Sequence, residues 1–205
     1  MNARDAAKAR TRRSILDGAL ELVGEHGFGS LGVREVAREA GIAPAAFYRH
    51  FKTLDELGLV LVEESFVPLH RMLREVRAPE VDPGDIARRS LEVLVANVAE
   101  HGGHLRFIAR ERNGGSPVLR RAIRQEIRLF TSELATDLAR MPLVDRWRTD
   151  DITLLAELIV MLMVETVATL LDTQPDRPDH VEAQVADVER QVRMLILGVV
   201  SWRSR

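Results

Sequence analysis

The chain has 205 residues, of which 46% are hydrophobic and 29% charged, a composition typical of a folded globular protein and unlike a disordered segment. It contains no cysteine, which excludes disulfides, thiolate nucleophiles and cysteine-ligated metals. The formal net charge of −2 hides an asymmetry: residues 1–53 hold nine Lys/Arg against six Asp/Glu and carry +3, which leaves −5 for the remainder. We therefore expect a polyanion to bind near the amino-terminal end.

Two segments bear on export and on membranes. The first 13 residues are basic and lead into an amphipathic stretch without a continuous apolar run, so we expect no secretory signal and a cytoplasmic protein. Residues 152–171 are long enough to span a bilayer, but they contain Glu157 and Glu165. Each carboxylate would cost roughly 2.5–3.5 kcal/mol inside a membrane. We therefore expect a buried helix of a soluble protein and no membrane partner.

Helical periodicity predicts four helices in the first part of the chain. They cover residues 10–26, 33–40, 44–50 and 53–76. Gly27 and Gly41 are natural stops for the first two helices, and Pro44 suits the first turn of the third.

The fourth predicted helix begins with a capping box. In this motif the Thr53 hydroxyl and the Glu56 carboxylate satisfy free backbone N–H groups reciprocally. Pro68 lies inside the same helix, where it removes a hydrogen bond and should bend the helix near Glu64.

Five further helices are expected, which makes about nine in all and no strand, so the predicted fold is all-α. They cover residues 85–101, 104–112, 116–140, 146–171 and 181–203. The last two helices carry apolar stripes at alternating spacings of three and four, so they can pair as a hairpin within one chain. Two such hairpins, one from each of two chains, can form a four-helix bundle. This predicts a homodimer, unless both stripes face only the core of the monomer. The candidate interface residues are Ile159, Leu162, Val188, Val192, Leu195 and Val199.

Residues 32–51, GVREVAREAGIAPAAFYRHF, have the layout of a helix-turn-helix: a short helix, a tight turn at residues 41–43 and a second short helix. The side chains expected to pack the two helices together are Val36, Ala37, Ile42, Phe47 and Phe51. The opposite face of the second helix would enter the DNA major groove, and it carries Ala45, Ala46, Tyr48, Arg49 and His50.

The run SLGVREVAREAGIAPAAFYRHFKTLDELGL, residues 30–59, resembles the TetR family of bacterial transcription repressors. Its FYRHF and DELGL pieces, with the downstream RFIARERNGGSPVLRRAI, resemble the fatty-acid branch of that family, the FabR and DesT repressors of unsaturated fatty acid synthesis. The resemblance implies a three-helix helix-turn-helix DNA-binding domain over residues 1–53 and a helical ligand-binding and dimerisation domain over residues 54–205. It also implies a homodimer on a near-palindromic operator in double-stranded DNA.

The resemblance further implies roles for single residues. Arg34 would reach a base edge, and Ala45 and Ala46 would meet thymine methyl groups. Tyr48 and Lys52 would hold phosphates, and Arg49 and His50 would contact bases or the backbone. Any one of these charges alone is more often an ordinary solvated side chain, but their convergence on one helix-turn-helix face favours the DNA role.

One position departs from the family pattern. Gly32 stands where the family usually has a Ser or Thr that caps the second helix and touches a phosphate. Glycine is tolerated as an N-cap but has no hydroxyl, so this phosphate contact should be missing. The basic leader with Lys8, Arg10, Arg12 and Arg13 could compensate by approaching the DNA backbone or the minor groove.

For the fatty-acid branch, the resemblance implies an effector held among the middle helices, a long-chain fatty acyl-CoA. The candidate pocket residues are Phe66, Leu69, Met72, Leu73, Leu94, Val98, Phe107, Ile108, Phe130, Leu158, Met161, Leu162 and Glu165. Apolar side chains at helical spacing are more often plain core than pocket.

Polar residues in the second half leave two questions open. Glu157 and Glu165 either form a polar device at the pocket or dimer seam, paired with Arg106, Arg110 or Arg112, or lie at the edge of the bundle in water. The sequence His101-Gly-Gly-His104 invites a metal, but without a third ligand nearby it is better explained as a helix connection.

No nucleophile–base arrangement, P-loop or GxGxxG is present, so we expect neither an enzyme nor a bound cofactor. The alternatives to an acyl-CoA-responsive repressor are a TetR-type repressor of another apolar effector and a helical interaction module without DNA binding.

Overall fold

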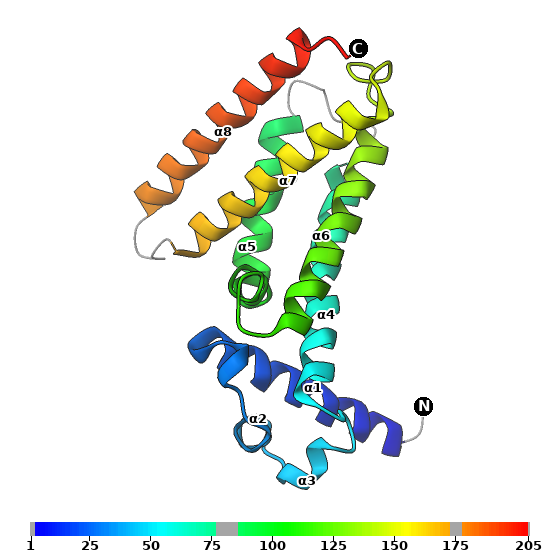
Figure 1. Ribbon diagram of the computed structural model, residues 1–205. Helices are drawn as coiled ribbons and strands as arrows, with labels where there is room; N and C mark the ends of the chain where they lie inside the picture. Colours follow the sequence, from blue (N-terminus) through cyan, green and yellow to red (C-terminus); the bar gives the residue numbers. More distant parts are fainter. Residues whose placement is uncertain (1–2, 77–85, 173–177, 205) are drawn as a thin grey trace. The chain divides into compact units, whose positions relative to one another are not determined.

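The computed structural model describes residues 3–76, 86–172 and 178–204, and within these ranges it contains helices and no strand. The all-α fold class is thereby confirmed. The helices are α1 (Ala3–His26), the 3-10 turn η1 (Phe28–Ser30), α2 (Val33–Glu39), α3 (Pro44–Phe47), α4 (Leu54–Val76), α5 (Ile86–Glu111), α6 (Pro117–Leu138), α7 (Thr149–Asp172) and α8 (Pro178–Ser201) (Figure 1).

The described part of the chain has eight α-helices where nine were expected, because two predicted helices run together as α5. The expected break is reduced to one residue, His101, whose backbone leaves the helical region with φ −120° and ψ 24°. Gly102 and Gly103 follow and remain helical. Glycine weakens a helix by about 1 kcal/mol relative to alanine, which local hydrogen bonding and packing can offset.

The first and third helices differ in length from the sequence prediction. Helix α1 begins at Ala3 and not near Arg10, because residues 3–9, ARDAAKA, consist mostly of alanine and charged helix formers. Helix α3 is a single turn that ends at Phe47, and Tyr48 to His50 continue as turns.

The start of α4 confirms one half of the predicted capping box and corrects the other. The Glu56 N–H donates to the Thr53 hydroxyl at 3.1 Å, as expected. The Glu56 carboxylate accepts from the N–H of Lys52 at 2.7 Å and not from that of Thr53. Farther along, α4 continues through Pro68 to Val76.

The chain forms two compact units. Unit 1 consists of Met1–Phe66 and Gly103–Gln125, and unit 2 consists of Val67–Gly102 and Glu126–Arg205. This division differs from the functional division expected at residue 53. The assignment of residues 1–53 to DNA binding and of 54–205 to ligand binding and dimerisation stays a prediction.

Unit 1 is built on a core from α1 to α4 and the adjoining parts of α5 and α6. Ile15, Phe47, Leu57, Phe107 and Leu119 are almost fully buried. Gly58 allows a close approach within this core, since a Cβ there would lie 2.6 Å from Cζ of Phe28 and 2.8 Å from Cδ2 of Leu119.

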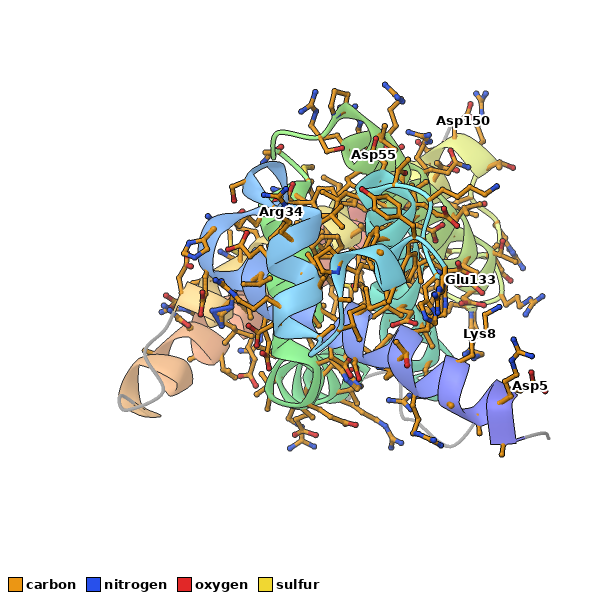
Figure 2. The ribbon with its side chains drawn as sticks, turned by 90° about the horizontal axis from the view of Figure 1, so that it is seen from below. Asp5, Lys8, Arg34, Asp55, Glu133 and Asp150 are labelled. Carbon is orange, nitrogen blue, oxygen red and sulfur yellow. The ribbon has the colours of Figure 1, made fainter. Side chains whose placement is uncertain are left out.

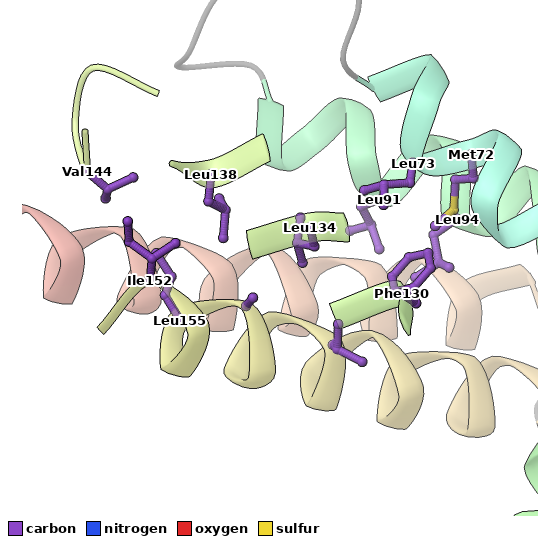
Figure 3. Close-up of a cluster of buried hydrophobic side chains, with 12 residues drawn as sticks. Met72, Leu73, Leu91, Leu94, Phe130, Leu134, Leu138, Val144, Ile152 and Leu155 are labelled. Atoms are coloured by element: carbon purple, nitrogen blue, oxygen red, sulfur yellow. The ribbon is translucent and has the colours of Figure 1, made fainter. Parts of the chain in front are cut away.

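Unit 2 has its own apolar core, to which α4, α5, α6 and α7 contribute (Figure 3). The buried members are Met72, Leu73, Leu91, Leu94, Phe130, Leu134, Leu138, Val144, Ile152, Leu155, Ala156 and Val160. Helices α7 and α8 lie side by side (Figure 1), and half-buried side chains of both pack against this core.

Helix α7 is long and apolar enough to cross a membrane by length and composition, with a mean hydropathy of 2.2 over its most apolar window. The core helices of soluble proteins pass the same test. The sequence predicted a buried helix, yet only 22% of that window is buried within the chain. Much of the helix is therefore exposed in the single chain.

Candidate nucleic-acid interface

The turn between α2 and α3 is closed by backbone hydrogen bonds and a glycine. The N–H of Ile42 donates to the carbonyl of Ala37 at 2.9 Å, and Gly41 adopts a φ of +68°, which favours glycine. Val36, Ala37 and Phe47 are completely buried, and α2 packs against both α1 and α3. The short helices are thus held as a rigid pair.

Seven residues were predicted to contact DNA, and all lie on this pair or directly after it. Arg34 on α2, labelled in Figure 2, is exposed. Ala45, Tyr48, Arg49 and Lys52 are exposed, whereas Ala46 and His50 are half-buried. This surface presents three basic side chains and one phenol to solvent, and their DNA contacts stay a prediction.

Neither short helix has a side-chain cap. Gly32 precedes α2 and Ala43 precedes α3, and neither position has a side-chain hydrogen bond to the helix. The missing hydroxyl at Gly32, expected from the sequence, therefore leaves the first N–H groups of α2 without a side-chain acceptor.

The basic leader on α1 divides into exposed and engaged side chains. Lys8 (labelled in Figure 2) and Arg10 are exposed. Arg12 lies 4.2 Å above the ring of Phe51 and donates to the carbonyl of His50 at 3.2 Å. This contact ties α1 to the end of the helix-turn-helix.

Arg13 binds acidic groups within the protein. It forms ion pairs with Asp17 at 2.5 Å and with Glu64 at 2.7 Å. The hydrogen bond that Arg13 donates to Asp17 and the charge of Glu64 raise the pKa of Arg13. These contacts make Arg13 a weaker candidate for DNA than Lys8 or Arg10.

Three cationic side chains act on His50. Burial lowers the pKa of its imidazole, and the charges of Lys8, Arg12 and Arg49 lower it further. Its Nδ1 is buried and has no hydrogen-bond partner among the residues that the structure describes. Cations from α1 and from the turn after α3 are thus brought together, a feature that the sequence spacing did not reveal.

The ligand candidates fall on both units, and their exposure differs. Buried are Phe66, Met72, Leu73, Leu94, Phe107, Ile108 and Phe130, and half-buried are Leu69, Val98 and Leu162. Leu158, Met161 and Glu165 lie on the exposed face of α7, because that helix turns its other side to the core of unit 2. Exposure does not favour a pocket role for these three, and the remaining assignments stay predictions.

The structure also shows where the polar residues in the second half of the chain lie. Glu157 and Glu165 are exposed, which agrees with the solvent alternative. Of the three arginines considered as partners, Arg110 donates to the carbonyls of Val23 and Gly24 at the end of α1. His101 forms a hydrogen bond with Arg71, and His104 forms one with Ser65, so the two histidines bond to different residues.

A polar contact between α4 and α6 in unit 2 was not foreseen. Nδ1 of His70 lies 2.7 Å from Glu133, its Nε2 lies 3.8 Å from Glu126, and its ring packs against Phe130. The two glutamates are seven residues apart on α6 and so share a face. No sequence signal paired them with a histidine more than fifty positions earlier.

The six dimer candidates are half-buried, and four of them pack against the unit's own core: Ile159, Val188, Leu195 and Val199. Other apolar side chains on the same two helices are exposed. These are Leu154, Leu158 and Met161 on α7, and Met194, Ile196, Leu197, Val200 and, after the helix, Trp202. We call these eight side chains the α7–α8 outer face.

Comparison with known proteins gives a family match in the first third of the chain. The family of bacterial regulatory proteins named tetR matches residues 15–59. These residues span the second half of α1, the helix-turn-helix and the start of α4.

Solved structures share the fold over nearly the whole length. The fatty acid degradation regulator FadR from Bacillus halodurans has a TM-score of 0.71 at 18% identity, with 95% of this chain and 97% of that chain covered. A putative fatty acid metabolism regulator of Clostridium perfringens has 0.68 at 18%, with 93% and 100% covered. AibR, solved with isovaleryl coenzyme A and operator DNA, has 0.67 at 15%, with 88% and 97% covered.

Proposed function

Since residues 15–59 match the tetR family of bacterial regulatory proteins, we propose that the chain is a cytoplasmic, ligand-responsive repressor that binds operator DNA. The observation that carries this proposal is the exposed surface of the helix-turn-helix, with Arg34, Tyr48, Arg49 and Lys52. Exposed arginines on such a pair can read base edges while lysine and tyrosine hold phosphates.

Selection of bound fragments from a random DNA library tests this proposal. We expect enrichment of a near-palindrome, whose half-sites lie about one helical turn apart because two recognition helices must read equivalent sequences. Failure to enrich any sequence would favour the alternative, a helical interaction module without DNA binding.

The proposed assembly is a homodimer through the α7–α8 outer face. In a single chain this face leaves Met161, Met194 and Val200 more than 60% exposed. Large exposed apolar patches mark association surfaces in soluble proteins. A twofold dimer would cover the face on both copies at once and would bring together two copies of the helix-turn-helix.

The proposed effector is a long-chain fatty acyl-CoA. The support is the fold shared with two regulators whose names refer to fatty acid metabolism, and with AibR, which was solved with an acyl coenzyme A. The buried apolar residues of unit 2, among them Met72, Leu94 and Phe130, offer side chains of the right chemistry. A repressor of another apolar effector is the alternative.

Calorimetry with saturated and cis-unsaturated acyl-CoAs, with and without operator, tests the effector. Each buried methylene contributes about 0.8 kcal/mol, so affinity should rise with chain length until the site is full. A ligand that changes operator affinity must bind the two conformations of the protein unequally. Absence of binding, with stabilisation by aromatic compounds in a thermal-shift screen, would support the alternative effector.

A further inference from the structure

A buried carboxylate from the end of α5 lies against the link between α1 and α2. Glu111 is 2% exposed, and its Oε1 accepts the N–H of Phe28 at 2.9 Å. Phe28 begins η1, the turn that leads from α1 into α2. The other carboxylate oxygen of Glu111, Oε2, is buried and has no hydrogen-bond partner among the described residues. A buried carboxylate with an unsatisfied oxygen is costly, so the contact to Phe28 calls for a role beyond stability.

The neighbouring residue binds the end of α1 itself. Nη1 of Arg110 donates to the carbonyls of Gly24 at 3.1 Å and Val23 at 3.4 Å. A cation at a helix carboxyl end also complements the helix dipole. Gly27 allows the approach, because its φ is +81° and a Cβ there would lie 3.2 Å from Nε of Arg110. Arg110 thus bonds to the end of α1 and Glu111 to the first residue of η1, so two consecutive residues bind both sides of the α1–η1 junction.

The turn after α5 holds Glu111 in place. The N–H of Gly114 donates to the carbonyl of Glu111 at 3.1 Å, and a Cβ on Gly114 would collide with the Glu111 carboxylate. Arg120 at the start of α6 donates to the carbonyls of Gly114 and Gly115. The carboxylate therefore has little freedom to leave Phe28.

We propose that Arg110 and Glu111 are positioning residues for DNA binding, which hold the α1–η1 junction and through it the orientation of α2 and α3. The inference rests on the proposed DNA-binding function. Neither residue lies on the helix-turn-helix, and both act through α1 and η1 within unit 1. Loss of either contact should release the helix-turn-helix from its fixed orientation without unfolding the unit.

Operator titration at a temperature where all variants are folded tests the proposal. Glu111→Ala should weaken operator binding at least about tenfold, the effect of losing one buried hydrogen bond to a charged group. Glu111→Gln keeps the acceptor oxygen and should retain most of the affinity. Ile123→Ala removes a fully buried side chain of the same unit, so it should lower stability but leave operator affinity near wild type.

Arginine variants provide a second matched pair. Arg110→Ala should weaken operator binding, whereas Arg106→Ala, an exposed position one turn earlier on α5, should not. Wild-type affinity in Glu111→Ala, or an equal loss of affinity in Ile123→Ala at the same loss of stability, would overturn the positioning role.

Hydrogen exchange separates this inference from the proposed function, since it needs no DNA. Glu111→Ala should speed exchange not only at Phe28 but throughout α2, whereas Ile123→Ala should not show this pattern. Exchange confined to Phe28 would mean that the contact is only local. If the wild-type protein bound no DNA, the function would fail while exchange would still decide whether Glu111 orients α2.

Discussion

The basic side chains near the helix-turn-helix differ in how free they are to meet DNA. Arg34 and Lys52 are exposed, whereas Arg12 and Arg13 already bond within the protein. We therefore expect the exposed cations and those that already bond within the protein to contribute differently to operator binding. The same distinction decides which substitutions report on DNA contacts and which disturb the protein itself.

Arg34→Ala and Lys52→Ala should separate base reading from phosphate binding. A good arginine–base contact discriminates by roughly 1–3 kcal/mol, so Arg34→Ala should lower the ratio of operator to random-DNA affinity. Lys52→Ala should weaken both affinities alike and reduce the salt slope by about one. Titrations at several salt concentrations measure both quantities. An unchanged affinity ratio in Arg34→Ala would remove its assigned role.

His50 should make the stability of the protein depend on pH. Its pKa is lowered in the folded chain from the ordinary 6.5, first by burial and then by Lys8, Arg12 and Arg49. The folded state therefore disfavours the imidazolium, and its stability is full above pH 6.5 and falls as pH drops through 6.5 toward the lower folded pKa. Urea denaturation across this range should show a shallower acid loss for His50→Gln.

At the scale of elements, close packing at Gly58 joins α4 to η1 and α6. Gly58→Ala would place a methyl group 2.6 Å from the ring of Phe28 and should destabilise unit 1 by about 1–3 kcal/mol. Gly24→Ala is the matched control, because a Cβ there meets nothing within 4 Å and alanine favours a helix by up to about 1 kcal/mol. Chemical denaturation compares the two. Equal effects of both substitutions would show that α4 can shift away from Phe28.

The sequence predicted those elements whose signals are local. Gly27 and Gly41 mark the ends of α1 and α2 because both backbones turn to positive φ there. The fusion of α5 across Gly102 and Gly103 was missed, since glycine pairs weaken a helix without always ending it. Contacts between distant segments carry no local signal, and the bond from Phe28 to Glu111 spans 83 residues.

At the scale of the whole molecule, the chain crosses between its two units three times, within α4, α5 and α6. The exposed DNA candidates Arg34 and Arg49 lie in unit 1, whereas most ligand candidates and the α7–α8 outer face lie in unit 2. Periodicity located the apolar stripes of α7 and α8 but could not tell the inner face from the outer one. That assignment depends on which side meets the core, which only the packed structure gives.

The α7–α8 outer face should be the seam of the dimer. Leu158→Asp together with Leu197→Asp places charges at two exposed apolar positions, one on each helix, and in a twofold dimer each would be buried twice. Burial of one large apolar side chain contributes roughly 1.5–3 kcal/mol, so this variant should become a monomer of 23.0 kDa by light scattering. Leu143→Asp, at an exposed leucine between α6 and α7, is the control and should stay dimeric. Leu195→Asp should instead lower stability, because Leu195 packs against the unit's own core. A double variant that keeps the mass of a dimer would place the seam elsewhere.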